Sequence, residues 1–299
     1  MAMAGKSRGK GDAAVAAVTY AAVTGFVLSI LYPLFNIASL SLSSYATYIK
    51  NPMMFFPTEL DFSAYGIVFG SKLLLSSYKN TVIITALGTG LTLFMTVIYA
   101  YPLSRPQVRF KPFFSTAIVI TMLFSGGIIP SFLLMRGLGL LNTYAAQYLP
   151  TVLGAYNCIL MVNFFKAMPE ELIEAAMMDG ASEPYILTRI VLPLSRPILA
   201  TIVLFAAVGL WNQYFSAVIY VRDQAKWPVQ LVLREILLAS STEALRSGGN
   251  LAELNAARRI PMEQLRYAAL IVVMLPITCI YPFLQKYFAS GVMLGAVKG

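Results

Sequence analysis

The stretch EELIEAAMMDGASEPYILTRIVLPLSRP, residues 170–197, is a charged island in a chain that is otherwise strongly apolar. The two glutamates that open it favour the first turn of a helix, and Gly180 can take the left-handed conformation that ends one. A second short helix is expected to begin at Ser182, an N-cap type of residue, and to stop before Pro193. The stretch therefore predicts a helix, a glycine corner and a second helix between two long apolar segments.

The composition indicates an integral membrane protein. Of its 299 residues, 58% are hydrophobic and 12% are charged, whereas charged residues make up about a quarter of soluble domains. The mean hydropathy is +0.72. The net charge of +9 has two interpretations: basic residues that flank membrane spans, or an anionic substrate or nucleic acid.

The absence of certain residue types and motifs from the sequence excludes several kinds of catalytic and nucleotide-binding site. The chain has no histidine, which rules out a Ser-His pair, an H-E-x-x-H zinc site or a histidine proton relay within it. Cys158 and Cys279 lie in apolar runs and indicate neither a disulfide framework nor a metal site. No G-x-x-x-x-G-K-[ST] sequence is present to cradle ATP phosphates. If ATP drives this protein, the nucleotide must bind a partner.

Uncharged windows mark the membrane spans, because each can hold the roughly 20 apolar residues that cross a bilayer. The windows lie between Asp12 and Lys50, Lys79 and Arg105, Lys111 and Arg136, Arg136 and Lys166, Arg196 and Arg222, and Arg266 and Lys286. The sequence therefore predicts an all-α integral membrane protein with six transmembrane helices.

The predicted organisation is a tail at 1–12, a six-span domain at 13–290 and a second tail at 291–299. The first apolar run is longer than the h-region of a signal peptide, so an uncleaved first span is expected with both termini in the cytoplasm. The loop 166–196 then lies inside, and two long segments, 50–78 and 222–265, lie outside. Lysines and arginines divide equally between the sides, so orientation depends on the first span and the short loops. Residues 62–78 could form an interfacial helix.

A spaced motif runs through the loop: E-A-A, then G after three residues, then I-x-L-P after nine more. E-A-A alone consists of good helix formers and fits an ordinary amphipathic helix. The full spacing resembles the EAA loop in the membrane subunits of bacterial ABC importers. The surrounding chain resembles the maltose-type permeases of carbohydrate importers.

Other blocks extend the resemblance from about the first span to Gly299, apart from the loop near residues 240–260. FSGGIIPSFLLMRGLGLLNTYAAQYLP, residues 124–150, is similar to the permease subgroup for complex and often acidic oligosaccharides, and GLWNQYFSAVIY, residues 209–220, resembles the family's W-N signature. The ending is similar to family tails that reach the ATPase dimer, with Ala296 in place of a glycine.

The resemblance implies that the loop forms a coupling helix seated in a cleft of a separate ATPase. A glutamate there could accept a charge-assisted hydrogen bond, and paired alanines allow close approach. Asp179 could be a structural cap or a partner contact. The residues expected to touch the ATPase are Glu174, Ala175, Ala176, Asp179, Gly180, Ile190, Leu192 and Pro193, with Gly295, Val297, Lys298 and Gly299 in the tail.

Polar residues within spans are candidates for a substrate pathway, since leaving them in lipid is costly. Amides and aromatic faces suit a sugar, but the same residue types also bridge helices or mark the membrane interface. The candidates are Trp211, Asn212, Gln213, Tyr214, Asn157, Asn163 and Tyr144. Gly126, Gly127 and Pro130 interrupt the third span and favour either close helix packing or a gating bend.

The resemblance implies one permease subunit of a type I ABC importer in the bacterial inner membrane. Its expected partners are a second homologous permease, an ATPase dimer that holds ATP and magnesium, an extracytoplasmic solute-binding protein, an oligosaccharide and membrane lipid. No cofactor, metal or nucleic acid is expected in this chain. The substrate is expected to be acidic, of the alginate or uronate type, with neutral malto- or gluco-oligosaccharides as the alternative.

Two other classes compete with this interpretation. A secondary carrier or channel would work without an ATPase, but such carriers usually need a carboxylate inside the membrane, and no predicted span has a charge at its centre. A membrane enzyme would need a catalytic cluster, and neither histidine nor cysteine joins the acidic residues of the loop.

Overall fold

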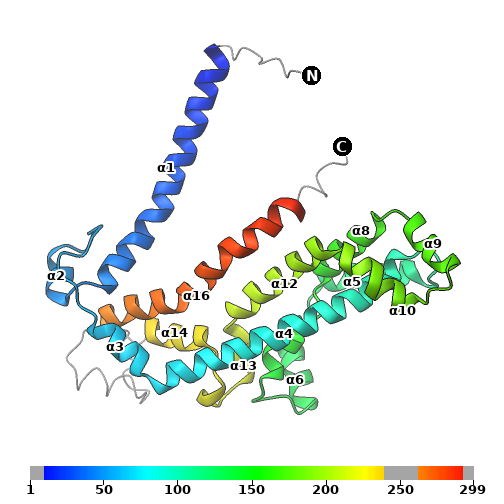
Figure 1. Cartoon of the computed structure of the whole chain (residues 1–299). Coiled ribbons are helices and arrows are strands. Elements are labelled where there is room, and N and C mark those ends of the chain that lie inside the picture. Colours follow the sequence, from blue (N-terminus) through cyan, green and yellow to red (C-terminus); the bar gives the residue numbers. More distant parts are fainter. Residues whose placement is uncertain (1–9, 239–261, 292–299) are drawn as a thin grey trace. The chain divides into compact units, whose positions relative to one another are not determined.

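The computed structural model of the chain describes the backbone of residues 10–238 and 262–291, and the side chains of 14–238 and 263–279 apart from that of Tyr45. This part is helical (Figure 1), and its single extended pairing is an isolated antiparallel bridge between Ser43 and Leu60. The all-α prediction is confirmed for these residues. The chain forms two compact units, residues 1–70 with 236–272, and residues 71–235 with 273–299.

The first unit consists of α1 (Lys10–Ser41), α2 (Tyr45–Lys50), α3 (Ser63–Gly70) and the beginning of α16 (Met262–Gly291). The apolar window of α1 has no side chain buried within the chain. The buried side chain of Gln264 connects α16 to the segment that follows α1. Its Nε2 donates to the Ser43 carbonyl at 2.8 Å and to Asp61 Oδ2 at 3.2 Å. Hydrogen bonds from Ser63 hold the pKa of the Asp61 carboxyl below its ordinary 3.8, against the opposing effect of partial burial, so this acceptor is ionised at neutral pH.

The second unit is built around α4 (Lys72–Ser104), which packs along α12 (Arg196–Trp211) and α8 (Ala155–Lys166). A Cβ added at Gly88 would lie 2.6 Å from Leu210 Cδ1 and 2.8 Å from Tyr148 Cβ. Glycine at this position therefore lets α12 and the segment before α8 approach the α4 backbone.

Shorter elements complete the second unit. They are α5 (Lys111–Leu123), α6 (Ile128–Gly137), α7 (Ala145–Tyr148), η1 (Leu149–Thr151), α9 (Glu171–Met178), α10 (Glu183–Ile186), the π-turn η2 (Leu187–Val191), α11 (Leu192–Leu194), α13 (Phe215–Tyr220), η3 (Gln224–Lys226) and α14 (Val229–Leu238), whose last residues belong to the first unit.

The described helices match the predicted spans in part. Two of them, α1 and α4, are long and apolar enough to cross a membrane, and up to five crossings result if each bent helix pair is one span. Two of these bent pairs lie within the third and fourth predicted windows, and the third pair joins the loop 166–196 to α12 at the start of the fifth window. The sixth window corresponds to the 30-residue α16.

Two boundaries differ from the sequence prediction. Residues 62–78 do not form one interfacial helix: α3 ends at Gly70, and Ser71 caps the start of α4 by accepting a hydrogen bond from the Leu74 amide at 3.3 Å. The second long helix therefore begins at Lys72, ahead of the predicted window, because this cap starts a new helix there.

The third predicted span is broken at its glycines, for which the sequence left both close helix packing and a bend open. The chain turns by 116° between α5 and α6. Gly127 has φ +83°, and among the described residues no atom beyond the adjacent residues lies within 4 Å of a Cβ placed on Gly126 or Gly127. Close helix packing therefore does not explain these glycines within this chain, whereas the left-handed turn does. Pro130 lies in the first turn of α6, where a missing N–H costs nothing.

Candidate functional site

The loop 166–196 folds as a short helical hairpin anchored by its apolar residues. Ile173 of α9, Ile186 of α10 and Val191 of η2 are buried in one cluster with residues of α4, α8 and α12. Gly180, with φ +81°, makes the corner between α9 and α10. The predicted helix, left-handed glycine and second helix are confirmed.

The second helix does not stop before Pro193, and that prediction was wrong. The chain continues from α10 through the π-turn η2 into α11, which includes Pro193. In an α-helix, a proline ring collides with the carbonyl four residues earlier. A π-turn widens the backbone at this point and moves that carbonyl away from the ring. The helix ends instead at Ser195, where the Ser195 Oγ donates to the Val191 carbonyl at 2.6 Å, and the chain bends by 82° into α12.

The eight predicted coupling residues divide by exposure. Glu174, Ala175, Asp179, Gly180 and Pro193 are exposed, whereas Ala176, Ile190 and Leu192 are half-buried. Ala176 and Leu192 pack against the apolar cluster. The exposed set can meet a partner, and the half-buried set holds the hairpin in place.

A groove of about 630 Å³ opens beside the corner. It combines small residues with one acidic, one basic and one aromatic side chain. Its lining is Ala176, Asp179, Gly180, Ala181, Ser182, Tyr185, Arg189 and Ile190. Together with the exposed Leu172 and Met178 of α9, the groove gives this hairpin a surface that is both apolar and charged, as protein interfaces are.

A polar cluster that the sequence did not predict joins the hairpin to α4. The Tyr101 hydroxyl donates to Glu183 Oε2 and accepts from Arg105 Nη2 at 3.1 Å. Arg105 Nη2 also lies 3.8 Å from Glu183 Oε2. Tyr101 and Arg105 are i,i+4 neighbours at the end of α4, but their acidic partner is distant in sequence, so no local pattern indicates it.

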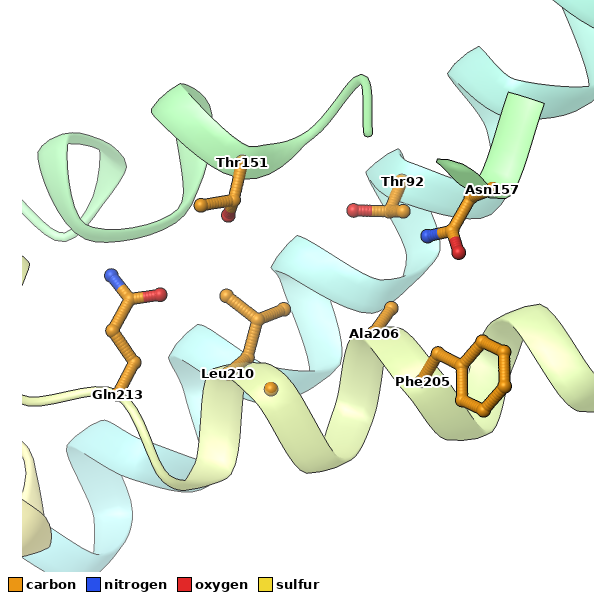
Figure 2. Close-up of a pocket in the computed structure, with 8 residues that line it drawn as sticks. Thr92, Thr151, Asn157, Phe205, Ala206, Leu210 and Gln213 are labelled. Atoms are coloured by element: carbon orange, nitrogen blue, oxygen red, sulfur yellow. The ribbon is translucent and has the colours of Figure 1, made fainter. Parts of the chain in front are cut away.

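A second candidate site is a cavity of about 210 Å³ between α4, α8 and α12. Figure 2 shows its side chains directed toward one space, with the Thr92 hydroxyl and the Asn157 amide on one side and the Gln213 amide on the other. The lining is Thr92, Thr151, Asn157, Phe205, Ala206, Gly209, Leu210 and Gln213. It contains neutral hydrogen-bonding groups, an aromatic face and no charge.

Two predicted pathway residues, Asn157 and Gln213, therefore meet in this cavity. Gln213 also donates through Nε2 to the Gln147 carbonyl, which positions it at the break between α12 and α13. Thr92 belongs to a face of α4 that carries a hydroxyl every three or four residues, namely Ser77, Thr81, Thr85, Thr89, Thr92 and Thr96. That helical period is the signal by which the threonine could have been found.

The remaining pathway candidates lie elsewhere. Trp211 is buried against Tyr78, with ring centroids 6.3 Å apart. The Arg234 guanidinium lies over the ring of Tyr214, 5.9 Å from the ring centroid. The exposed Asn212 accepts a hydrogen bond from Gln230 at 3.4 Å. Tyr144 and Asn163 do not line the cavity either. Only part of the predicted set is thus brought together.

Comparison with known proteins identifies the family. The model of the family "Binding-protein-dependent transport system inner membrane component" matches residues 107–293, which is more than half of the chain. The chain belongs to this family. The resemblance to ABC importer permeases is thus confirmed, and membership argues against the carrier, channel and membrane-enzyme alternatives.

Individual relatives of this permease cover nearly its whole length. It is 40% identical to Protein LplC of Bacillus subtilis (strain 168), over 90% of both chains. It is 38% identical to the polygalacturonan/rhamnogalacturonan transport system permease protein YtcP of the same organism, over 92% of this chain and 94% of that one. A chain of a bacterial ABC transporter involved in the import of the acidic polysaccharide alginate is 36% identical, with a TM-score of 0.86, and the match covers 94% of the permease and 98% of that chain.

One more segment of the permease is tied down by polar contacts. Residues 221–229 are held at the beginning of α4, where Asn80 Nδ2 donates to the Ala225 and Trp227 carbonyls at 2.8 and 2.9 Å. The Tyr144 hydroxyl donates to Asn80 Oδ1 at 2.9 Å. Tyr144 thus connects the start of α7 to α4.

The predicted tail contacts Gly295, Val297, Lys298 and Gly299 lie outside the described residues. Within the residues that are described, no group of three or more His, Cys, Asp or Glu side chains could hold a metal ion.

Proposed function

We propose that this chain is one of two permease subunits of an ATP-driven importer that carries an oligosaccharide from an extracytoplasmic binding protein into the cytoplasm. In this proposal α9, the corner at Gly180 and α10 form the coupling element. Two separate ATPase subunits, with ATP and magnesium, close on each other and move the paired permeases between outward and inward openings.

The exposed carboxylate of Glu174 on an anchored helix is the observation that carries this proposal. Glu174 is exposed, whereas its neighbour Ile173 is buried in the cluster shared with α4, α8 and α12. A force applied to the exposed face is therefore transmitted to three long helices. A freely hinged loop could not do this.

The proposed topology has six spans with both termini in the cytoplasm. Contacts within the second unit support the alternation of sides. Residues 221–229 touch the beginning of α4 through Asn80, and the hairpin touches its end through Tyr101. The two segments thus meet opposite ends of one long helix, as an outer segment and a cytoplasmic loop must.

The proposed substrate is an oligosaccharide that contains uronate units. The names of the alginate and polygalacturonan transport proteins support this class. The cavity of about 210 Å³ has no charged lining, and it is smaller than the roughly 300–1,000 Å³ of ordinary ligand pockets. We therefore assign it to part of a sugar unit, with Asn157 and Gln213 as hydrogen-bonding groups and Phe205 as an apolar face. Recognition of the carboxylates is then expected outside this cavity. Neutral malto- or gluco-oligosaccharides remain the alternative.

Purification of the tagged chain from its native membrane tests the assembly. An ATPase and a second permease should co-purify with the wild type. Glu174→Lys should abolish ATPase association, because it replaces the exposed carboxylate by a positive charge that repels a basic residue of the ATPase. Glu59→Lys makes the same change on the predicted outer segment and should retain the ATPase. Recovery of the chain alone, with Glu174→Lys harmless, would refute the proposal.

A further inference from the structure

Three side chains connect the loop hairpin to the end of α4. The Tyr101 hydroxyl connects Glu183 and Arg105, because it donates a hydrogen bond to Glu183 and accepts one from Arg105 at 3.1 Å. Arg105 also stacks its guanidinium 5.0 Å from the centroid of the same ring. We call Tyr101, Arg105 and Glu183 the clasp.

The clasp is held firmly on its α4 side. Tyr101 and Arg105 are both 8% exposed, and the Tyr101 ring packs edge-on against Phe165 of α8, with centroids 6.3 Å apart. Lys111 Nζ donates to the Arg105 carbonyl at 2.9 Å, which fixes the turn that leaves α4. Glu183, the first residue of α10, is the more exposed partner, with a side chain that is 52% exposed.

Apolar packing anchors the hairpin but is less directional than polar contacts. Burial of Ile173, Ile186 and Val191 is favourable, and the hydrophobic effect that drives it is non-directional. The hydrogen bonds of the clasp form at only one rotation of the hairpin relative to α4, because a hydrogen bond weakens steeply when its donor and acceptor are misaligned.

We propose that Tyr101, Arg105 and Glu183 are positioning residues for energy coupling, which make α4 and the hairpin move as one body when an ATPase pushes on the hairpin. The inference rests on the proposed function. It also extends it, since none of the three residues belongs to the EAA spacing and two of them lie at the end of α4, outside the hairpin.

The structure supplies a matched pair of variants for the test. Tyr101→Phe removes the bridging hydroxyl and keeps the ring against Phe165. Tyr99→Phe removes a hydroxyl two residues earlier on the same helix, where it donates to the Phe114 carbonyl at 2.8 Å and takes no part in the clasp. Each variant is purified as the full transporter and placed in liposomes, and transported sugar and hydrolysed ATP are counted together.

Tyr101→Phe should retain its ATPase subunits and its ATP hydrolysis, but the sugar moved per ATP should fall about three- to tenfold, the range expected for one lost hydrogen bond of ordinary net strength. Hydrogen exchange of amides 183–191 should rise by a similar factor in the same complex. Glu183→Gln, which keeps a hydrogen-bonding oxygen but loses the charge, should show a smaller loss of coupling. Tyr99→Phe should match the wild type in each measurement.

The outcomes separate the two proposals. A coupled wild-type transporter in which Tyr101→Phe and Tyr99→Phe move the same sugar per ATP would overturn the clasp and leave the proposed function intact. A wild-type complex without any ATPase would overturn the proposed function itself. If Tyr101→Phe does not assemble, the comparison of Glu183→Gln with Tyr99→Phe decides the question on the same scale.

Discussion

Gly180 shows how one residue type can be required by backbone geometry alone. Its φ of +81° lies in the left-handed region, and in the described part of the chain no atom beyond the adjacent residues lies within 4 Å of the place where a Cβ would stand. Space is therefore not the constraint, and the left-handed conformation is. The corner it makes directs α10 back toward α4, where Glu183 joins the clasp.

Replacement of Gly180 tests this at the residue scale. Gly180→Ala should destabilise the hairpin by about 1–2 kcal/mol, the cost of a left-handed conformation for an L-residue. Thermal unfolding of the purified complex and retention of the ATPase would measure the effect. Gly180→Asn should cost less, because asparagine visits this region more readily. Equal stability of the alanine variant and the wild type would show that the corner relaxes without strain.

At the scale of elements, α4 is the helix on which both candidate sites depend. Its last turn carries Tyr101, its middle carries Thr92 of the cavity, and its first turns carry Asn80, which holds residues 221–229. Close approach of α12 at Gly88 brings Leu210 into the cavity wall. The packing of α4 against α12 therefore sets the shape of the cavity.

Two glycines of α4 give a matched comparison of this packing. Gly88→Ala should destabilise the chain by about 1–3 kcal/mol, the usual cost of overpacking, because its Cβ would collide with Leu210 and Tyr148. Gly90→Ala places the same methyl where nothing lies within 4 Å and should stabilise the helix by about 0.5–1 kcal/mol. Thermal stability in detergent would distinguish them, and a neutral Gly88→Ala would contradict the close contact.

For the whole molecule, the arrangement separates a neutral cavity from a charged hairpin. The cavity has no charge in its lining, and the hairpin has Glu174, Asp179 and Glu183 on or beside its exposed surface. If the proposed function holds, sugar contact and energy coupling can thus be changed independently, although α4 connects the two sites.

Uptake measurements with two asparagines of α8 test this separation. Asn157→Ala should lower sugar uptake several-fold, because the Asn157 amide lines the cavity, but the preference between acidic and neutral oligosaccharides should be unchanged, since the amide carries no charge. Asn163→Ala changes an exposed asparagine of the same helix that is not part of the cavity lining and should have no effect. A shift in charge preference with Asn157→Ala would place charge recognition in this chain.

The sequence by itself determined the membrane class, the all-helical fold, the uncharged windows and the glycine corner. These follow from local properties: apolar runs, the positions of charged residues along the chain, and the backbone conformations that glycine and proline can adopt. It did not determine the helix that continues through Pro193, because whether a π-turn forms there depends on what the widened turn packs against.

Only the tertiary structure decided which residues meet. Glu183 and Tyr101 are 82 residues apart, and Asn80 and Ala225 are 145 apart, so no local pattern pairs them. Trp211 and Gln213 are near neighbours in sequence, yet one is buried against Tyr78 and the other lines the cavity. The direction in which a side chain points depends on how helices pack, and a hydrogen bond forms only where packing brings donor and acceptor together.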